Sequence, residues 1–343
     1  METENTLTVK ERLEKSINEI RSQLPGLEIL ENEPMSAHCS FKTGGPARAF
    51  AAPRDISSLS KVLCILKENN LAPYMLGNGT NVVFPDEGTP SLFVISTEKL
   101  QNMFLLEDGS IYAEAGVSLA RLAGFALDSG LSGLEFASGI PGTVGGGVIM
   151  NAGAYGGELK DVIQSVVLYY LQDQTLYEMA NGQCSFGYRS SYFQKTPGCV
   201  ILSAVFQLKP GSHGEIAEKM KELNARRRDK QPLDMPSAGS AFRRPEGYYA
   251  AALIEECGLK GCSIGGAQVS EKHAGFIVNT GNATSKDLYD LVLHVRNTVY
   301  REKNVQMTPE IILLPPDYCL EDNGPRLFRN MFTGGMAPPE EKE

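Results

Sequence analysis

The stretch that most constrains the fold of this chain is 130–158, which reads GLSGLEFASGIPGTVGGGVIMNAGAYGGE. It is too rich in glycine and too poor in charge for an ordinary helix or strand, and five glycines fall within the nine residues 139–147. Because glycine has no Cβ, its backbone adopts conformations that other residues avoid and lets another molecule approach closely. Clustered backbone N–H groups hold anions without side-chain charge, particularly where a loop enters a helix N-terminus. The stretch therefore predicts a phosphate-binding loop, although a tight backbone crossing would also use glycine.

A second loop of the same kind, LGNGTNVV at 76–83, follows the apolar segment 71–75. Two phosphate-type loops in one chain indicate a dinucleotide ligand. The second loop lacks the third glycine of the Rossmann fingerprint, and the sequence contains no Gly-Lys-Ser/Thr of a P-loop. We therefore expect the dinucleotide to be held by a different fold.

The composition is that of a globular protein: 42% of the 343 residues are hydrophobic and 21% are charged, enough for two or three domains. The net charge of −9 argues against a general nucleic-acid binder, which needs many Lys and Arg. No apolar run reaches the roughly 20 residues that span a bilayer. The seven cysteines are an odd number and no signal segment is recognised at the N-terminus, so we expect reduced thiols and a cytoplasmic protein. No feature indicates an obligate protein partner.

No metal site is predicted. Cys257 and Cys262 are the closest cysteine pair, but their spacing is wider than that of a zinc knuckle and no second pair follows. The four histidines are dispersed along the chain, so most are expected at the surface or in hydrogen bonds of the core.

Hydrophobic periodicity and turn signals predict an α+β arrangement. An amphipathic helix at 7–24 is followed by a strand at 49–52, a helix at 56–69 and a strand at 71–75, whose end carries the second loop, where ligands tend to lie. The other expected helices are 118–129, 144–152, 214–230, 248–257 and 285–303, and the other expected strands are 92–95, 111–115, 162–170, 176–178, 200–208, 264–269, 276–279 and 311–314.

The densest positive charge of this acidic chain is RRRDK at 226–230, at the end of the expected helix 214–230. Such a cluster serves either as a solvated helix face or as a contact to the phosphate of an anionic ligand, and the sequence leaves both open. The segment from 321 onward is polar and rich in Gly and Pro, which predicts disorder.

Seven stretches carry a family resemblance: FKTGGPA at 41–47, LGNGTNVVFPDEG at 76–88, SGIPGTVGGGVIMNAGAYGGE at 138–158, FGYRSS at 186–191, KQPLDMPSAGSAFRRP at 230–245, GAQVSEKHAGFIVN at 266–279 and TPEI at 308–311. In this order they resemble the UDP-N-acetylenolpyruvoylglucosamine reductases, the flavoproteins of peptidoglycan precursor synthesis, over about four-fifths of the chain. The short interval between Tyr192 and the strand at 200 resembles the shorter, second type of this family.

The resemblance implies an α+β fold, with an FAD-binding domain of the vanillyl-alcohol-oxidase or PCMH type followed by an α/β substrate-binding domain. The implied boundaries are an N-terminal helix at 1–33, the FAD-binding domain in two subdomains at 34–210, the substrate domain at 211–320 and a disordered tail at 321–343. The implied cofactor is FAD, with NADPH as reducing co-substrate. The positions that would hold FAD are Asn78, Gly79, Thr80, Asn81, Val82, Ser138, Gly139, Pro141, Gly142, Gly145 and Gly146.

The implied activity is NADPH-dependent reduction of UDP-N-acetylglucosamine enolpyruvate to UDP-N-acetylmuramate, by hydride transfer from FAD N5 to C3 and protonation at C2. Arg189 would offer its donors to the substrate carboxylate as negative charge develops there. Glu310, if it carries or shares a proton, could hydrogen-bond the same enolate, and Ser240 would donate the proton to C2. Because a serine hydroxyl is a very weak acid, that role requires a neighbouring cation or relay.

Tyr188 and Lys230 fall on substrate-side positions of the family, with Lys230 near the diphosphate. The chain departs from the family pattern at two places: Arg244 stands where many relatives carry asparagine, and Asn78 stands where glycine is commonest. Arg243 and Arg244 are therefore left without an assigned role.

Two other functions compete. An oxidase or dehydrogenase of small alcohols would keep the FAD fold, but many such enzymes tether FAD through histidine, and we expect no histidine beside either glycine loop. A non-enzymatic ligand-binding protein on the same scaffold is the second alternative. The joint presence of Arg189, Ser240 and Glu310 argues against it.

Overall fold

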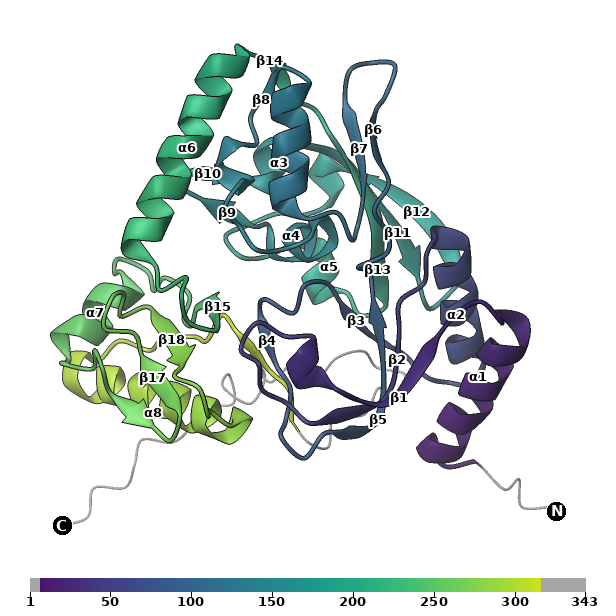
Figure 1. Ribbon diagram of the computed structural model, residues 1–343, viewed down its shortest axis with the longest axis horizontal. Coiled ribbons are helices and arrows are strands. Elements are labelled where there is room, and N and C mark those ends of the chain that lie inside the picture. The colour runs from purple at the N-terminus through teal and green to yellow at the C-terminus, as the bar shows by residue number, and fades with distance from the viewer. Residues whose placement is uncertain (1–6, 316–343) are drawn as a thin grey trace.

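The computed structural model describes residues 7–315 (Figure 1). The predicted disordered tail at 321–343 lies outside them. Within the described range, no helix combines the length and apolarity needed to cross a bilayer. In the same range, no group of at least three His, Cys, Asp or Glu residues is arranged to hold a metal ion.

The N-terminal part is a four-stranded sheet with two helices. α1 (Val9–Gln23) and α2 (Ile56–Glu68) begin at side-chain caps, because Thr8 and Asp55 accept hydrogen bonds from backbone N–H groups of the first turn. β5 lies parallel between β2 and β3, so the expected strand–helix–strand unit is present with one strand inserted. The sheet order is β1-β2-β5-β3, and the strands are β1 (Ile29–Pro34), β2 (Pro46–Ala51), β3 (Tyr74–Leu76) and β5 (Thr89–Ser96).

The middle part is built on a five-stranded antiparallel sheet of order β12-β11-β13-β7-β6. Its strands are β6 (Met103–Leu105), β7 (Ile111–Glu114), β11 (Ile163–Tyr170), β12 (Thr175–Ala180) and β13 (Cys199–Phe206). α3 (Leu119–Asp128) and α4 (Val144–Met150) share one apolar core with this sheet. Shorter elements connect them: β8 (Leu131–Ser132), β9 (Gly153–Ala154), β10 (Gly157–Glu158), α5 (Tyr192–Lys195), β14 (Lys209–Pro210) and the 3-10 turns η1 (Met35–Ala37), η2 (Glu135–Ala137), η3 (Leu159–Asp161) and η4 (Asn181–Gln183).

The C-terminal part begins with α6 (His213–Lys230), which in Figure 1 runs from the neighbourhood of α3 and β8 down to a second small sheet. That sheet has the order β15-β18-β17-β16, and α7 (Ala250–Glu256) and α8 (Ser285–Lys303) accompany it. The strands are β15 (Ser237–Ser240), β16 (Ser263–Ile264), β17 (Ala267–Val269) and β18 (Phe276–Asn279).

The last strand returns the chain to the N-terminal part. β19 (Ile312–Leu313) pairs in parallel with β4 (Val82–Val83), which directly follows the second glycine loop. One apolar core contains residues of both the N-terminal and C-terminal parts, and Asn279 Nδ2 donates to the Phe41 carbonyl at 2.8 Å across them. Residues 310–312 are therefore held beside the second glycine loop, where Ile312 N also donates to the Asn81 carbonyl at 2.9 Å. The domain boundaries at 34, 211 and 321 stay predictions.

The expected single strand at 264–269 is a tight hairpin of β16 and β17 instead. Gly265 lies in the left-handed region at φ +52°, and Asp287 Oδ2 accepts a hydrogen bond from Gly266 N at 3.3 Å. This turn folds the strand back on itself, whereas the pairing of β17 with β18 is as expected. The edge strand β1 was not predicted, because its residues ILENEP lack the alternation of a half-buried strand.

Candidate functional site

The two glycine loops, 76–82 and 138–146, lie side by side, and we call them together the glycine cradle. A Cβ built on Gly77 would lie 2.6 Å from Thr143 Oγ1, and one on Gly142 would lie 4.0 Å from Thr80 Oγ1. Thr143 also caps α4, because its Oγ1 accepts from Gly146 N at 3.4 Å. The sequence predicted two loops for one ligand, and the fold brings them together at one helix N-terminus.

The glycines of the cradle serve two purposes. A Cβ on Gly79 would lie 2.0 Å from the His38 carbonyl, and one on Gly145 would lie 3.0 Å from Ala115 Cβ, so packing alone requires glycine there. Gly142 and Gly146 are different: a Cβ on either would find no atom nearer than 3.7 Å. The protein therefore leaves room beside both glycines, and Gly146 is exposed, which is the arrangement that a closely approaching diphosphate needs. The cradle therefore fits FAD.

The other predicted cofactor positions differ in exposure. Asn78 and Pro141 are exposed, whereas Val82 is buried and belongs to β4, so it could offer a ligand its backbone alone. Asn81 faces the C-terminal segment, with Nδ2 donating to the Glu310 carbonyl at 3.3 Å. Ser138 is tied to α6, because its Oγ accepts from Asn224 Nδ2 at 3.2 Å.

The expectation that no histidine lies beside the cradle is wrong, because the carbonyl of His38 contacts Gly79. Its ring, however, is directed elsewhere. Nε2 lies 2.8 Å from Glu33 Oε1, and the imidazole stacks on Phe50 with ring centroids 4.0 Å apart.

Arg189 stands in a tight turn outside the cradle. Gly187 and Ser190 exchange backbone hydrogen bonds of 2.9 and 3.1 Å, and Arg189 occupies the left-handed region at φ +51°. That conformation costs a non-glycine residue roughly 1–2 kcal/mol, so the surrounding contacts must hold it. Tyr188, in the same turn, is half exposed, and the Arg189 guanidinium lies 5.5 Å from its ring centroid.

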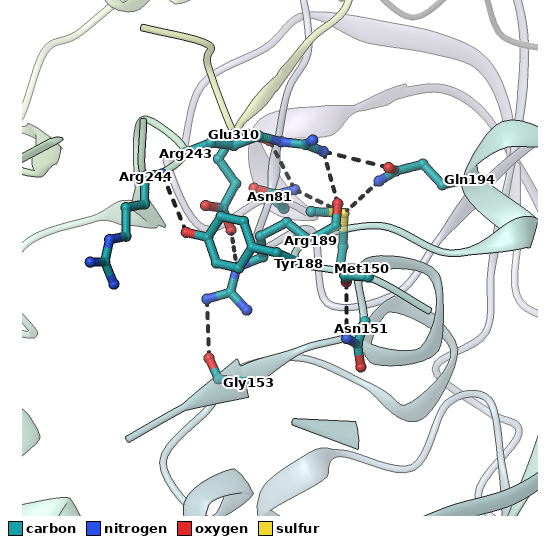
Figure 2. Close-up of polar contacts among 11 residues, drawn as sticks. Asn81, Met150, Asn151, Gly153, Tyr188, Arg189, Gln194, Arg243, Arg244 and Glu310 are labelled. Carbon is teal, nitrogen blue, oxygen red and sulfur yellow. Dashed lines mark hydrogen bonds and ion pairs between the residues drawn. The ribbon is translucent and has the colours of Figure 1, made fainter. Parts of the chain in front are cut away.

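The Arg189 side chain joins the glycine-rich stretch to the C-terminal segment (Figure 2). Its Nη2 donates to the Gly153 carbonyl at 3.0 Å, and its Nε lies 2.8 Å from Glu310 Oε1. The second contact is an ion pair without good hydrogen-bond alignment, since Nε has no acceptor in line with its N–H. Two predicted catalytic residues that are far apart in sequence are thus in direct contact.

Ser240 is held near Glu310 by backbone hydrogen bonds between two segments. Glu310 N donates to the Ala241 carbonyl at 2.8 Å, and Arg243 N donates to the Thr308 carbonyl at 2.9 Å. The segments 240–243 and 308–310 therefore run beside each other. Ser240 is exposed, and its hydroxyl makes no hydrogen bond to any residue that the structure describes. We call Tyr188, Arg189, Ser240, Arg243 and Glu310 the polar cluster.

The position of Lys230 is separate from the contacts of the polar cluster. It is the last residue of α6 and is exposed, and within residues 7–315 no hydrogen bond or ion pair links it to the cluster. Its substrate-side role stays a prediction.

Arg243 was left unassigned by the sequence, and the structure gives it a position. Its Nη2 donates to the Arg189 carbonyl at 2.8 Å and lies 3.5 Å from Gln194 Oε1 (Figure 2). Burial lowers the pKa of the Arg243 guanidinium below its ordinary value, and the Glu310 carboxylate opposes that shift. Arg243 thus holds the strained turn from the side of Ser240.

Asn151, at the end of α4, supports the same turn, although its role was not predicted from the sequence. It is fully buried, its Nδ2 donates to the Gly187 carbonyl and to Glu158 Oε2, both at 3.0 Å, and its Oδ1 accepts from Lys160 N at 2.9 Å. It ends α4 in the left-handed region at φ +43°. Asparagine after a helix is a known signal for this conformation, and it could have marked the residue.

Arg244, the departure from the family pattern, lies at the edge of the polar cluster. Its backbone N donates to Tyr188 Oη at 3.3 Å, its Nε donates to the Tyr248 carbonyl at 3.2 Å, and its guanidinium lies 4.0 Å from the Tyr249 ring centroid. Its side chain therefore faces away from Arg189 (Figure 2).

Two family models match the chain. One is described as the C-terminal domain of UDP-N-acetylenolpyruvoylglucosamine reductase and matches residues 231–314; the other is described as an FAD binding domain and matches residues 47–177. These matches, together with the fold, confirm the expected order of an FAD-binding domain followed by a C-terminal domain.

The similar proteins agree with these models. A UDP-N-acetylenolpyruvoylglucosamine reductase of Caldanaerobacter subterraneus is 45% identical over 86% of this chain and 96% of its own length, and one of Limosilactobacillus reuteri is 43% identical over 86% and 98%. The crystal structure of a UDP-N-acetylenolpyruvylglucosamine reductase from Thermus caldophilus superposes with a TM-score of 0.71 at 34% identity, over 84% of this chain and 99% of that one.

Proposed function

This chain belongs to the UDP-N-acetylenolpyruvoylglucosamine reductase family, and from that membership we propose how its own residues carry out the reaction. It is an FAD-dependent oxidoreductase that uses NADPH to convert UDP-N-acetylenolpyruvoylglucosamine to UDP-N-acetylmuramate in peptidoglycan precursor synthesis. The observation that carries the residue assignment is the 2.8 Å approach of Arg189 Nε to Glu310 Oε1, beside the strand that bears Ser240.

The glycine cradle is proposed to hold FAD, with the open backbone of Gly142 and Gly146 toward the diphosphate. The exposed Asn78 and the half-buried Thr80 of the second loop would hold its other side, and Thr80 Oγ1 would lie 4.0 Å from a Cβ on Gly142. When bound, FAD supplies the hydride, taken from NADPH, for C3 of the enolpyruvyl group.

Arg189 is proposed to stabilise the negative charge that develops on the substrate carboxylate after C3 is reduced. A guanidinium presents a planar fork of donors, and it is effective here because the contacts to Gly153 and Glu310 fix its direction in advance. Glu310 holds the guanidinium in place and, when it carries a proton, can hydrogen-bond the developing enolate.

Ser240 is proposed to give its hydroxyl proton to C2, which completes the reduction of the substrate. Because Ser240 is exposed, solvent water would return a proton to the serine oxygen. Its hydroxyl is free of partners within residues 7–315, and its strand lies beside Glu310, so the donor is held at the cluster and remains accessible. Tyr188 and Lys230 are proposed to contact the UDP-sugar.

The cytoplasm is the proposed compartment. The six cysteines within the described residues are all free thiols, which is the usual state of cysteine in that compartment.

An anaerobic absorbance experiment tests the proposal. We expect the purified protein to show a flavin spectrum that NADPH bleaches and that UDP-N-acetylenolpyruvoylglucosamine restores. Recovery of the oxidised spectrum with oxygen or a small alcohol's carbonyl product, but not with the UDP-sugar, would instead favour the oxidase alternative. If the protein binds the UDP-sugar but NADPH does not reduce its flavin, the result would favour the non-enzymatic alternative.

A further inference from the structure

The basic cluster at the end of α6 is not one surface. Arg226 lies on the exposed side, where its Nη2 pairs with Glu222 Oε1 at 2.6 Å, and Arg228 is also exposed. Arg227 points the other way and is partly buried. The two interpretations that the sequence left open therefore apply to different residues: Arg226 and Arg228 form a solvated helix face, and Arg227 needs its own explanation.

Arg227 faces the glycine cradle. A Cβ built on Gly139 would lie 3.0 Å from Arg227 Cδ and 2.5 Å from Asn224 Oδ1, so both side chains contact this glycine of the first loop. Asn224 and Arg227 are three residues apart and share one face of α6. Asn224 also donates to Ser138 Oγ at 3.2 Å, which ties α6 to the loop at the adjacent residue.

Among the residues that the structure describes, none of opposite charge pairs with the guanidinium of Arg227. Within residues 7–315 no hydrogen bond or ion pair involves its side chain. Burial lowers the pKa of its guanidinium below the ordinary value, and no carboxylate among residues 7–315 opposes this shift. Partial burial of an unpaired cation is unfavourable, so the position makes physical sense where an anion from outside the chain completes it.

We propose that Arg227 binds a phosphate group of a ligand held at the Ser138–Gly139 corner of the glycine cradle. The planar fork of a guanidinium matches two phosphate oxygens, which a lysine cannot do. The diphosphate of FAD is the first source, because the cradle is the proposed FAD site; the phosphates of NADPH and of the UDP-sugar have the same chemistry. The inference rests on the proposed function only in the choice of these three ligands.

The test compares Arg227→Gln with Arg226→Gln, a matched control one position along the same helix. Apoprotein is titrated with FAD, and the dissociation constant is read from the change in flavin fluorescence, without any substrate. We expect Arg227→Gln to weaken FAD binding by about tenfold or more, and Arg226→Gln to stay within about twofold of the parent protein. Arg227→Lys should recover part of the loss, because it keeps the charge but not the fork.

Two further arms identify the source of the phosphate. The KM values for NADPH and for the UDP-sugar are measured on FAD-loaded variants. An unchanged FAD dissociation constant with a KM raised about tenfold for one of them supports the proposal with that ligand as the source. If all three constants of Arg227→Gln match those of Arg226→Gln, the proposal is wrong.

As a control for correct folding, the melting temperature of each apoprotein is measured. If Arg227→Gln fails to fold, Arg227→Lys is used for the test instead, because lysine keeps the charge and most of the apolar stem. If Arg227→Lys then binds FAD as tightly as the parent protein does, the need for a guanidinium is contradicted. Failure of the proposed function has a different signature, since the UDP-sugar would then not reoxidise the flavin of the parent protein while the FAD titration would still report on Arg227.

Discussion

The glycine cradle and the polar cluster are built in opposite ways. The cradle consists of two continuous loops and is proposed to bind FAD through backbone groups beside glycines 142 and 146, where the protein leaves room for a Cβ. The polar cluster is proposed to act through side chains that three distant segments, 187–190, 240–243 and 308–310, bring together. Damage to the cradle should reduce FAD binding and with it both half-reactions. Damage to the cluster should leave FAD bound and slow only the step with the UDP-sugar.

The largest effect is expected from Ser240→Ala, which removes the proposed proton donor. Proton transfer by a positioned side chain contributes roughly 10²- to 10⁴-fold, so reoxidation of the reduced flavin by the UDP-sugar should slow by about that factor. Stopped-flow absorbance measures it, with Ser237→Ala on the same strand β15 as control. A slowing of less than about tenfold would remove Ser240 from the proposed role.

Arg189→Lys should have the next largest effect. Lysine keeps the positive charge but cannot contact Gly153, Glu310 and the substrate carboxylate together, so kcat should fall by about 10²- to 10³-fold with a smaller change in KM. Steady-state kinetics with excess NADPH measure both constants. A rise in KM with unchanged kcat would show that Arg189 binds the substrate without stabilising the developing charge.

Gly146→Val places a side chain on the open face of the cradle. Outside the backbone of its own helix, the nearest atom to the new Cβ would be Thr143 Oγ1 at 3.7 Å, so the Cβ itself meets no clash within the protein, whereas it would stand in the way of an approaching diphosphate. FAD binding should weaken by about 10- to 100-fold, which corresponds to about 1.4–2.8 kcal/mol. The control is Gly124→Val in α3, where a Cβ would meet nothing within 4 Å. Equal FAD affinity of the two variants would contradict the assignment of this face.

Asn151 connects the two regions, because it ends the helix of the cradle and holds the turn of Arg189. Asn151→Gly keeps the left-handed backbone but leaves Gly187 O and Glu158 without the amide, which should lower the free energy of unfolding by about 1–3 kcal/mol. The UDP-sugar step should slow by about tenfold, because the turn that presents Arg189 loses a support. Urea unfolding and stopped-flow absorbance measure the two quantities; a variant as stable as the parent protein would show that backbone conformation alone fixes this residue.

The smallest effect concerns pH and lies outside both regions. Burial lowers the pKa of His273, so the unfolded chain takes up a proton before the folded chain does as the pH falls below about 6.5. Stability should therefore decrease from pH 7.5 toward the lower pKa of the folded state. His273→Asn, whose amide oxygen can replace the acceptor of Gly275 N, should lose less stability between about pH 7 and pH 5.5. Parallel losses in both proteins would assign the pH dependence to other groups.

The same contrast explains what could be predicted from the sequence. The cradle was visible because its glycines are contiguous and mark an unusual backbone, and α8 was placed at Ser285–Lys303 from periodicity alone. Arg189, Ser240 and Glu310 were found through family resemblance, since nothing local distinguishes them. The sequence did not allow a role to be assigned to Arg243 or Asn151, because each contacts a partner far along the chain. Arg227 could not be assigned because the packing of α6, which the sequence does not show, decides which face of the helix it lies on.

The most direct test measures both half-reactions in Gly146→Val and Arg189→Gln under the same conditions. FAD occupancy, flavin reduction by NADPH and reoxidation by the UDP-sugar are followed anaerobically. We predict that Gly146→Val loses FAD occupancy, and that Arg189→Gln keeps full occupancy and normal reduction but reoxidises about 10³-fold more slowly. If Arg189→Gln instead lost FAD, or slowed both half-reactions equally, the division of labour between cradle and cluster would be contradicted.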